Sequence, residues 1–563
     1  TGLLERMNTL LGYDYAPYLP LLWVSTQDGF ETIARQDFQY AIHQELNRNF
    51  YTPLSQWCAN HGIALTGHPA GSGDVGPEVY FQQPGQDVVW RYVVPGPTKL
   101  EGEHSTLGKS ATSVAAQLQR PIVINECYGA YGWNLTMNEM KWLADWLFVR
   151  GTNRLFPHAF YYSVNEQRIY ERPPDLSRFN LWANHYRQFS DYTDRMSWLL
   201  TESRAEVPAA IITLAGYTPW TIAKTLFQNQ IDFHYLDETL LDRVAVQDGL
   251  LRIGEGKYQA LILDEIHFLT AETAQKIVQF MEQGANVMAF RSRMELHPLR
   301  GARNDSVLSQ IRNHSRFHHY DTDEEQLAAV RSFLVPSVIV PSPCHDLRAQ
   351  HRMKSGVDFY LLTNEGEEPI ASTIRVPGQM RYPEIWNAED GEMKLETNAG
   401  YSEQGIELAI DLPPRQSRIL VFPPGGANVP ESARLQTIDP VRQTRPIPNE
   451  GWILSIGEKT YSDQTLDFWT KKEELISFSG TGWYSTSIPM TKEELSSGTH
   501  VLLDLGEVQS WAQVEVNGVS CGVRLWPPFQ FDITKAIHEG DNPIRIGITN
   551  TRANELTAEK GPS

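Results

Sequence analysis

The stretch that decides the fold is Pro121-Ile-Val-Ile-Asn-Glu-Cys-Tyr-Gly-Ala-Tyr-Gly-Trp133, an apolar run that ends in a carboxylate and passes into a loop of glycines and aromatic residues. A short apolar run of this kind predicts a buried strand of a parallel sheet. In (β/α) barrels the active site lies at the carboxyl ends of the strands, so the pattern places Glu126 at a candidate catalytic position. The structural alternative is a carboxylate that only caps a loop.

Strands and helices alternate on both sides of this stretch. Thr136 and Glu139 have the spacing of a capping box and predict the start of a helix after it. Strands are predicted at residues 63–66, 88–94, 121–125 and 154–160. Four strands are half of a barrel of eight, so residues 1–205 predict a partial (β/α) TIM-like barrel. The chain begins at Thr1 without an initiator Met or a signal peptide, which predicts a fragment or processed product with further strands upstream.

The rest of the chain predicts three further domains. Residues 206–334 alternate strands and helices as in a small doubly wound α/β domain, and the carboxylates Asp264 and Glu265 at one strand end are expected to have capping or solvated roles. Residues 335–425 and 426–563 are rich in short alternating strands and predict two β-sandwiches. The predicted fold class is therefore multidomain α/β plus all-β.

Composition excludes several classes of function. The 563 residues contain 48 Lys and Arg against 68 Asp and Glu, and the net charge of -20 argues against a nucleic-acid partner. No apolar run approaches the roughly 18 residues of a membrane helix, which argues against membrane insertion. The four cysteines lack metal-site spacing, and they leave the compartment open between periplasmic or secreted and cytoplasmic. The oligomeric state is equally open.

A pair of carboxyl groups would suit the cleavage of a glycosidic bond. One group protonates the leaving oxygen, and apolar neighbours raise its pKa so that it keeps the proton. Glu126 is the candidate acid. Glu103, ahead of Glu101, is the candidate second carboxylate, although either could cap the helix that is expected near Ser105.

Further candidate residues lie in the loops that follow the predicted strands. Aromatic rings there could stack on a sugar, and histidines could bind its hydroxyl groups or have structural roles. The predicted substrate-binding residues are His68, Tyr128, Tyr131, Trp133, His158, Tyr161 and Tyr162. No metal ligands are predicted.

The segments Asn125-Glu-Cys-Tyr-Gly-Ala-Tyr-Gly-Trp-Asn-Leu-Thr136 and Arg150-Gly-Thr-Asn-Arg-Leu-Phe-Pro-His-Ala-Phe-Tyr-Tyr-Ser163 resemble glycoside hydrolase family 106, the α-L-rhamnosidases. Shorter similar elements are Gly12-Tyr-Asp-Tyr-Ala-Pro-Tyr-Leu-Pro20, Trp57-Cys-Ala-Asn-His-Gly-Ile63 and Lys109-Ser-Ala-Thr-Ser-Val-Ala-Ala116. The resemblance implies removal of terminal α-L-rhamnose with inversion, and an association with calcium. The block from Gly506 to Thr534 looks like the galactose-binding-like sandwich of family 2 glycosidases.

Together these patterns predict a glycosidase that removes terminal α-L-rhamnose from a plant or bacterial polysaccharide or glycoside. Inverting hydrolysis would use Glu126 and Glu103 separated by about 6.5 to 9.5 Å, and it needs no cofactor for the chemistry. One alternative is a retaining β-glycosidase of the large barrel clan, with carboxyl groups about 5 to 5.5 Å apart. Another is a non-catalytic fragment that binds carbohydrate.

Overall fold

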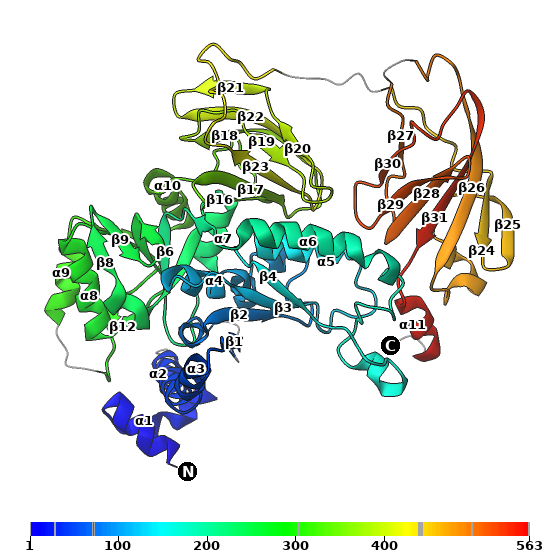
Figure 1. Cartoon of the computed structure of the whole chain (residues 1–563). Helices are drawn as coiled ribbons and strands as arrows, with labels where there is room; N and C mark the ends of the chain where they lie inside the picture. Colours follow the sequence, from blue (N-terminus) through cyan, green and yellow to red (C-terminus); the bar gives the residue numbers. More distant parts are fainter. Residues whose placement is uncertain are drawn as a thin grey trace.

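The computed structural model describes residues 2–26, 30–69, 71, 74–300, 305–436, 443–496 and 499–560. Helices begin the chain, two parallel sheets follow, and two groups of antiparallel strands end it (Figure 1). The predicted combination of mixed α/β and all-β parts is confirmed. The sheets of the described residues include no closed barrel. No helix within these ranges is both long and apolar enough to cross a membrane.

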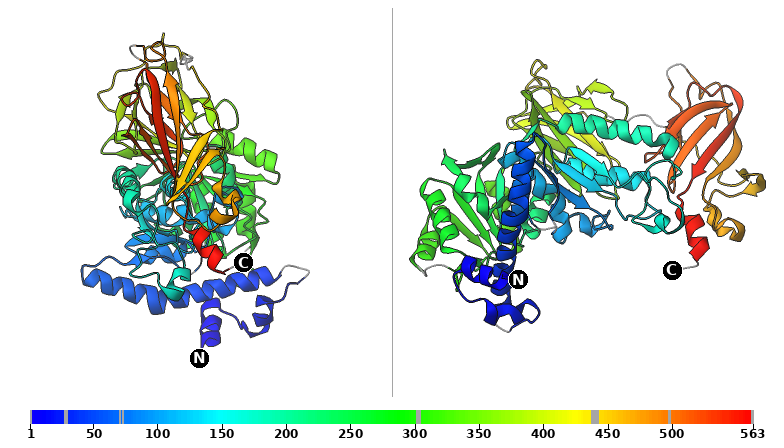
Figure 2. Two further views of the ribbon diagram at one scale, coloured as in Figure 1. Left: turned by 90° about the vertical axis from the view of Figure 1, so that its right-hand side faces the viewer. Right: turned by 60° about the horizontal axis from the view of Figure 1, so that its bottom comes forward.

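The N-terminal helices form a layer beside the parallel sheets. Helix α1 (Leu3–Leu11) is followed by α2 (Phe30–Leu46), which continues through the π-helical turn Asn47–Tyr51 into α3 (Thr52–Asn60). Figure 2 shows α2 and α3 as a long rod across one side of the molecule. Oδ1 of buried Asp37 of α2 lies 3.1 Å from the Nε2 atom of His297, and this contact attaches the rod to the segment that follows residues 295–296.

The first parallel sheet carries the candidate site. Its strands follow the order of the chain, β1 (Thr66–Gly67), β2 (Gln83–Val88), β3 (Ile124–Cys127) and β4 (Arg154–Pro157). Helix α4 (Leu107–Gln117) connects β2 to β3, and α5 (Met137–Phe148) connects β3 to β4. The predicted capping box of Thr136 and Glu139 starts α5. Helix α6 (Tyr186–Leu200) packs on α5, and Figure 1 shows both beside this sheet.

The second parallel sheet has the strand order β15-β13-β11-β6-β7. Three of its strands, β6, β7 and β11, are buried at every residue, which is the pattern of strands covered on both faces. The strands are β6 (Ala209–Thr213), β7 (Phe233–Asp237), β11 (Ala260–Asp264), β13 (Asn286–Phe290) and β15 (Phe317–Tyr320). The helices are α7 (Thr221–Gln228), α8 (Ala271–Glu282), α9 (Asp305–Asn313) and α10 (Asp323–Phe333). Smaller pieces are β8 (Ala245–Gln247), β9 (Leu250–Ile253), β10 (Gly256–Tyr258), β12 (Phe268–Leu269) and β14 (Glu295–Leu296).

Antiparallel strands dominate the remainder. One group has a six-stranded sheet, β20-β19-β23-β17-β16-β5, and a three-stranded sheet, β18-β22-β21. Its strands are β5 (Arg204–Ala205), β16 (Leu347–Lys354), β17 (Val357–Asn364), β18 (Ile370–Pro377), β19 (Glu384–Trp386), β20 (Met393–Leu395), β21 (Ala399–Ser402), β22 (Gly405–Leu412) and β23 (Ser417–Phe422).

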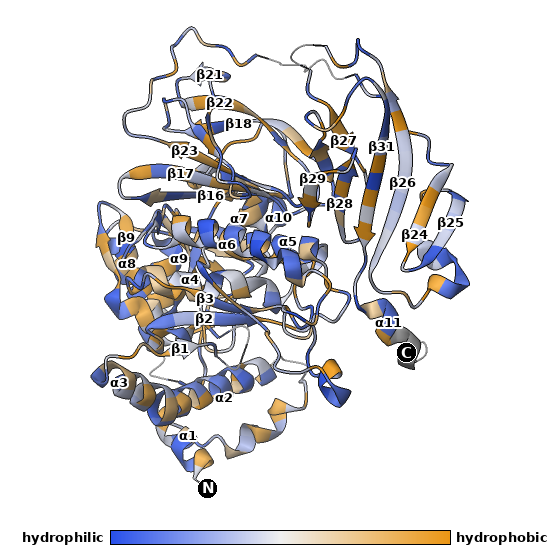
Figure 3. Ribbon diagram, turned by 45° about the vertical axis from the view of Figure 1, so that its right-hand side comes forward, coloured by the Kyte–Doolittle hydropathy of each residue, from blue (hydrophilic) through white to orange (hydrophobic). Residues whose placement is uncertain are grey.

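The last group pairs the sheet β25-β24-β26-β31-β28-β29 with the two-stranded sheet β27-β30. Figure 3 shows hydrophobic and hydrophilic residues alternating along β31 and its neighbours, as expected where one face of a sheet is buried. The strands are β24 (Trp452–Ile456), β25 (Lys459–Gln464), β26 (Thr481–Met490), β27 (Leu502–Asp504), β28 (Trp511–Val516), β29 (Val519–Arg524), β30 (Gln530–Asp532) and β31 (Gly540–Thr549). Helix α11 (Ala553–Lys560) follows.

Candidate active site

Two carboxylates and an imidazole meet at the carboxyl ends of β1, β2 and β3. Asp87 of β2 lies opposite Glu126 of β3, and Glu126 lies opposite Phe156 of β4. Residues paired in register point to the same face of a sheet, so these three side chains form one row. His68 follows β1 directly, and its Nε2 atom is 3.7 Å from Asp87 Oδ2. One side-chain oxygen or nitrogen from each of His68, Asp87 and Glu126 lies within 4.8 Å of the others.

Asp87 is held in a setting that favours its protonated form. Its side chain is 21% exposed, and its Oδ1 atom is buried without a hydrogen-bond partner in the described part of the chain. Burial, and then the neighbouring Glu126 carboxylate, raise the pKa of Asp87 to about 6, whereas His68 and Arg172 lower it. Asp87 therefore keeps its proton to a higher pH than an isolated aspartate.

The cluster of His68, Asp87 and Glu126 does not match the ligand set of calcium. Calcium takes roughly six to eight oxygen ligands, whereas this group offers two carboxylates and one imidazole nitrogen. It is the only set of three or more such side chains gathered closely enough to hold an ion in the described ranges. The calcium that the family resemblance implies therefore has no fitting site among these side chains, and no step of the chemistry below depends on it.

The aromatic residues after β3, predicted to bind substrate, lie in the protein interior. Tyr128 adopts a positive φ of 76°, and the loop carries the Tyr128 and Tyr131 rings into the core beside α5. The Tyr128 hydroxyl donates to the Met140 carbonyl at 3.0 Å. The Tyr131 hydroxyl donates to the Val93 carbonyl at 2.6 Å, and Trp133 Nε1 donates to Ile169 at 2.6 Å. All three side chains are buried, which argues against direct contact with a substrate, and sugar binding by them stays a prediction.

The loop after β4 begins at the same edge of the sheet as Glu126, where substrate-binding residues were predicted. The backbone amide of His158 donates to the Cys127 carbonyl at 2.8 Å, which holds His158 at the same sheet edge as Glu126. Its Nδ1 atom is buried without a hydrogen-bond partner among described residues, and its ring lies 6.1 Å from the Tyr161 ring. The Tyr161 hydroxyl donates to the Arg172 carbonyl at 3.0 Å, and Tyr162 is 89% exposed. Sugar binding by His158, Tyr161 and Tyr162 stays a prediction.

The two glutamates predicted as second carboxylate lie outside the cluster. Glu103 is in the 3-10 helix Glu103–Thr106 before α4, where its side chain is 73% exposed and Oε1 lies 3.8 Å from His104 Nε2. Glu101 pairs with Lys224 at 2.6 Å. The carboxylate that the structure brings to Glu126 is Asp87 instead. Sequence reasoning missed Asp87 because Gln83-Pro-Gly-Gln reads as a loop, although these residues begin β2.

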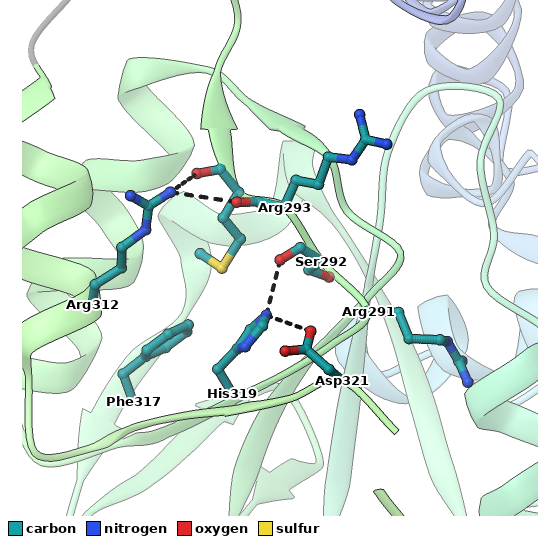
Figure 4. A pocket seen from close by; sticks show the side chains of 8 residues that line it. Arg291, Ser292, Arg293, Arg312, Phe317, His319 and Asp321 are labelled. Carbon is teal, nitrogen blue, oxygen red and sulfur yellow. Dashed lines mark hydrogen bonds and ion pairs between the residues drawn. The ribbon is translucent and has the colours of Figure 1, made fainter. Parts of the chain in front are cut away.

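A separate hollow of about 590 Å³ lies at the carboxyl ends of β13 and β15. Figure 4 shows Arg291 pointing away from it, and Arg312 donates to the carbonyl oxygens of Met294 and Arg293 at 3.1 and 3.4 Å. Among the described residues that line it, Asp321 is the single carboxylate. The hollow lacks the pair of carboxyl groups that glycosidic cleavage requires, so the cluster around Glu126 is the better candidate site.

Paired carboxyl groups at the ends of parallel strands are the arrangement of glycoside hydrolases, and comparison with known proteins places the chain in that class. A family model described as alpha-L-rhamnosidase, glycoside hydrolase family 106, matches residues 1–398. The chain therefore belongs to this family, as the resemblance predicted.

Two relatives define how far the similarity extends. The structure of the rhamnosidase from Novosphingobium sp. PP1Y has a TM-score of 0.72 and 21% sequence identity, and the match covers 99% of this chain and 56% of that one. A protein of Formosa agariphila named "Putative beta-glucuronidase" is 22% identical over 427 residues, which are 70% of this chain and 34% of that protein. The chain thus spans about a third of the curated relative and just over half of the solved rhamnosidase.

Proposed function

We propose that this chain carries the catalytic carboxyl groups of a glycosidase that releases terminal α-L-rhamnose from a plant or bacterial polysaccharide or glycoside. The observation that carries the proposal is the position of Asp87 opposite Glu126, with one carboxylate oxygen of each within 4.8 Å of the other, in a chain of the α-L-rhamnosidase family. Such a pair can hold one proton near neutrality and present one carboxylate beside it. Both are needed to cleave an acetal.

In the proposed reaction the Asp87 and Glu126 pair donates its proton to the departing glycosidic oxygen. The pKa of Asp87 near 6 keeps a useful fraction of the pair protonated at mildly acidic pH. His68, 3.7 Å from Asp87, is placed to hydrogen-bond a sugar hydroxyl and to stabilise the carboxylate after the proton has left. Phe156, 46% exposed and next to Glu126 in register, offers an apolar surface for the sugar ring.

The stereochemistry depends on where the second carboxylate acts. In the inverting reaction predicted from the family, Glu103 would activate water on the opposite face of the sugar. A retaining reaction would need only the close pair, because its carboxyl groups stand about 5 to 5.5 Å apart rather than about 6.5 to 9.5 Å. The facing atoms of Asp87 and Glu126 lie within 4.8 Å, which favours retention as the second candidate.

The test is the hydrolysis of 4-nitrophenyl α-L-rhamnoside by the chain and by Glu126→Gln and Glu103→Gln variants, with the anomer of the first product identified by NMR. We expect Glu126→Gln to lower kcat about 10³-fold, in the range of a lost general acid. An inverted product from the unaltered chain, together with loss of activity in Glu103→Gln, would support Glu103 as the base. An active Glu103→Gln variant with a retained product would support the close pair alone.

Two outcomes would overturn the proposal. Full activity of Glu126→Gln would remove Glu126 from the chemistry. Glycan binding without turnover of any nitrophenyl glycoside in a panel, with and without chelator, would support the non-catalytic alternative and would measure any dependence on calcium. The same panel would define the sugar.

The layout proposed for the chain follows the sequence prediction. The four parallel strands and helices α4 and α5 would be a segment of a (β/α) barrel, and the antiparallel groups would be two β-sandwiches, the last of them galactose-binding-like. The domain limits at residues 205, 334 and 425 stay a prediction. The proposed partner is an oligosaccharide or polysaccharide, and the reaction needs no cofactor.

A further inference from the structure

An arginine and a tryptophan stand together beside the carboxylate pair. The Arg172 guanidinium lies over the Trp90 ring, with Cζ 5.7 Å from the ring centroid. Trp90 is 53% exposed, although a ring of its size is usually well buried. It follows Asp87 by three residues, so the two side chains stand at the carboxyl end of β2.

The backbone holds this pair in a fixed place. The Trp90 amide donates to the Gly129 carbonyl at 2.9 Å, and the Arg172 carbonyl accepts from Ala130 at 3.2 Å. These bonds join the loops that follow β2, β3 and β4. Trp90 and Arg172 both adopt positive φ angles, 55° and 50°, which cost conformational energy in residues other than glycine. Such strain is common where a side chain must be aimed at a ligand.

The charge of Arg172 is not neutralised by a salt bridge. In the described part of the chain no carboxylate oxygen lies within 4.0 Å of its guanidinium, even though acidic residues outnumber basic ones by 68 to 48. Arg172 is nevertheless close enough to Asp87 to lower the pKa of that carboxyl group. A guanidinium with unused donors, over an exposed aromatic ring and next to a site for glycosidic cleavage, is suited to a planar anion.

We propose that Trp90 and Arg172 form the subsite for the leaving sugar, and that this sugar is a uronic acid. Its ring would lie on Trp90, and its carboxylate would take two hydrogen bonds from the Arg172 guanidinium. This inference rests on the proposed function and specifies its substrate: a rhamnosyl uronate, as in an acidic polysaccharide. A neutral leaving sugar would make the aromatic contact and leave the guanidinium without its anion.

The test compares two ligands that differ only at C6, methyl β-D-glucuronide and methyl β-D-glucoside, by NMR titration at pH 6. We expect the glucuronide to bind about 10-fold more tightly, as for a charge-assisted pair at a partly exposed site. Arg172→Gln should remove the preference, and Arg172→Lys should keep part of it because a single charge remains. The preference should also weaken in high salt.

Arg168→Gln is the matched control, because it removes the same charge four residues away from an exposed arginine outside the site. It should leave the preference unchanged. Equal binding of the two ligands to the unaltered protein, or a preference that survives Arg172→Gln, would overturn the proposal. Circular dichroism of each variant shows whether it is folded.

A kinetic comparison separates this inference from the proposed function. Rhamnosyl glucuronate should be cleaved with about 10-fold higher kcat/KM than rhamnosyl glucose, and Arg172→Gln should equalise the two. Turnover of both disaccharides without a preference would sink the uronate subsite and leave the rhamnosidase proposal intact. Preferential binding of the glucuronide without turnover of either disaccharide would support the uronate subsite and contradict the rhamnosidase proposal.

Discussion

Each of the two parallel sheets has an aspartate at or next to the carboxyl end of a strand, and the two aspartates have different bonding partners. In the second sheet β11 ends at Asp264, whose Oδ1 atom lies 2.7 Å from Arg291 Nη2 and whose Oδ2 accepts from the Ile222 amide at 3.1 Å. In the first sheet Asp87 has one buried oxygen without a hydrogen-bond partner in the described ranges, and its neighbours are His68 and a second carboxylate. Burial raises the pKa of both aspartates to about 6.

The difference indicates what distinguishes an acid with a structural role from the acid for which we propose a role in catalysis. Asp264 is satisfied by an arginine and a backbone amide, so its charge is fixed in place and useful only to the fold. Asp87 keeps an unsatisfied oxygen beside Glu126, so a ligand can gain by bonding to it. A strand end and a raised pKa are common to both, and only the partners separate them.

Substitution of each aspartate by asparagine should give the largest difference between the two sites. Asp87→Asn should lower kcat for an aryl rhamnoside by about 10²- to 10³-fold, because it removes one of the two carboxyl groups that together hold the proton. Unaltered protein should lose activity as the pH rises through about 6, where Asp87 gives up its proton, and the variant should lack that limb of the profile. Asp264→Asn should stay within about 3-fold of the original kcat. Equal losses in both variants would refute the contrast.

Removal of Arg291 tests whether Asp264 has a structural role. Arg291→Ala takes from Asp264 the cation that balances it, and we expect a loss of about 3 kcal/mol in the free energy of unfolding by urea denaturation. Arg312→Ala, a neighbouring arginine that donates only to backbone carbonyls, serves as the control and should cost less. A neutral result for Arg291→Ala would mean that Asp264 does not depend on its partner.

Substitution at Asp87 should change the free energy of unfolding in the opposite direction, because it should stabilise the protein. Asp87 has a higher pKa in the folded protein than its ordinary value of 3.8, so its ionised form destabilises the fold. This penalty is absent well below the unfolded value and complete above pH 6. Asp87→Asn should therefore stabilise the protein by about 2 kcal/mol at pH 7.5, with the gain shrinking as the pH falls towards 4. A destabilised variant at pH 7.5 would contradict the account of the site.

The smallest expected effect concerns Tyr128, an aromatic residue that the sequence assigned to substrate binding and that the structure buries. Tyr128→Phe removes one buried hydrogen bond to the Met140 carbonyl and should cost about 1 kcal/mol of stability. Because the ring lies in the core, KM for an aryl rhamnoside should not change. A raised KM with unchanged stability would return Tyr128 to the substrate site.

Sequence patterns predicted the regular parts of the site well. The apolar run before Glu126 forms β3, the capping box starts α5, and His68 reaches the sheet edge where it was expected. These features depend on neighbours within a few residues. In the second sheet, the apolar runs 209–213 and 286–290 form β6 and β13 for the same reason.

The other features of the site depend on backbone geometry that local sequence patterns do not predict. Pro84 and Gly85 hid the start of β2, and with it the register that sets Asp87 opposite Glu126. The positive φ at Tyr128 turned the next aromatic rings inward, whereas their spacing from Glu126 suggested a sugar platform. Arg172 lies 46 residues after Glu126, and only the loop contacts bring it to Trp90.

Helix α4 has a consequence for how the molecule can be divided. It packs on β2 of one parallel sheet and on β7 of the other, and its Lys109 forms a buried ion pair with Asp232 at 2.6 Å. Ser113 and Gln117 on the same helix bond to the backbone of Tyr235. If the chain were cut after residue 205, the amine of Lys109 and the polar side chains of Ser113 and Gln117 would be exposed to solvent. All three lie on the segment that carries the proposed catalytic carboxyl groups. The second parallel sheet therefore stabilises the segment that carries Asp87 and Glu126 by packing against α4.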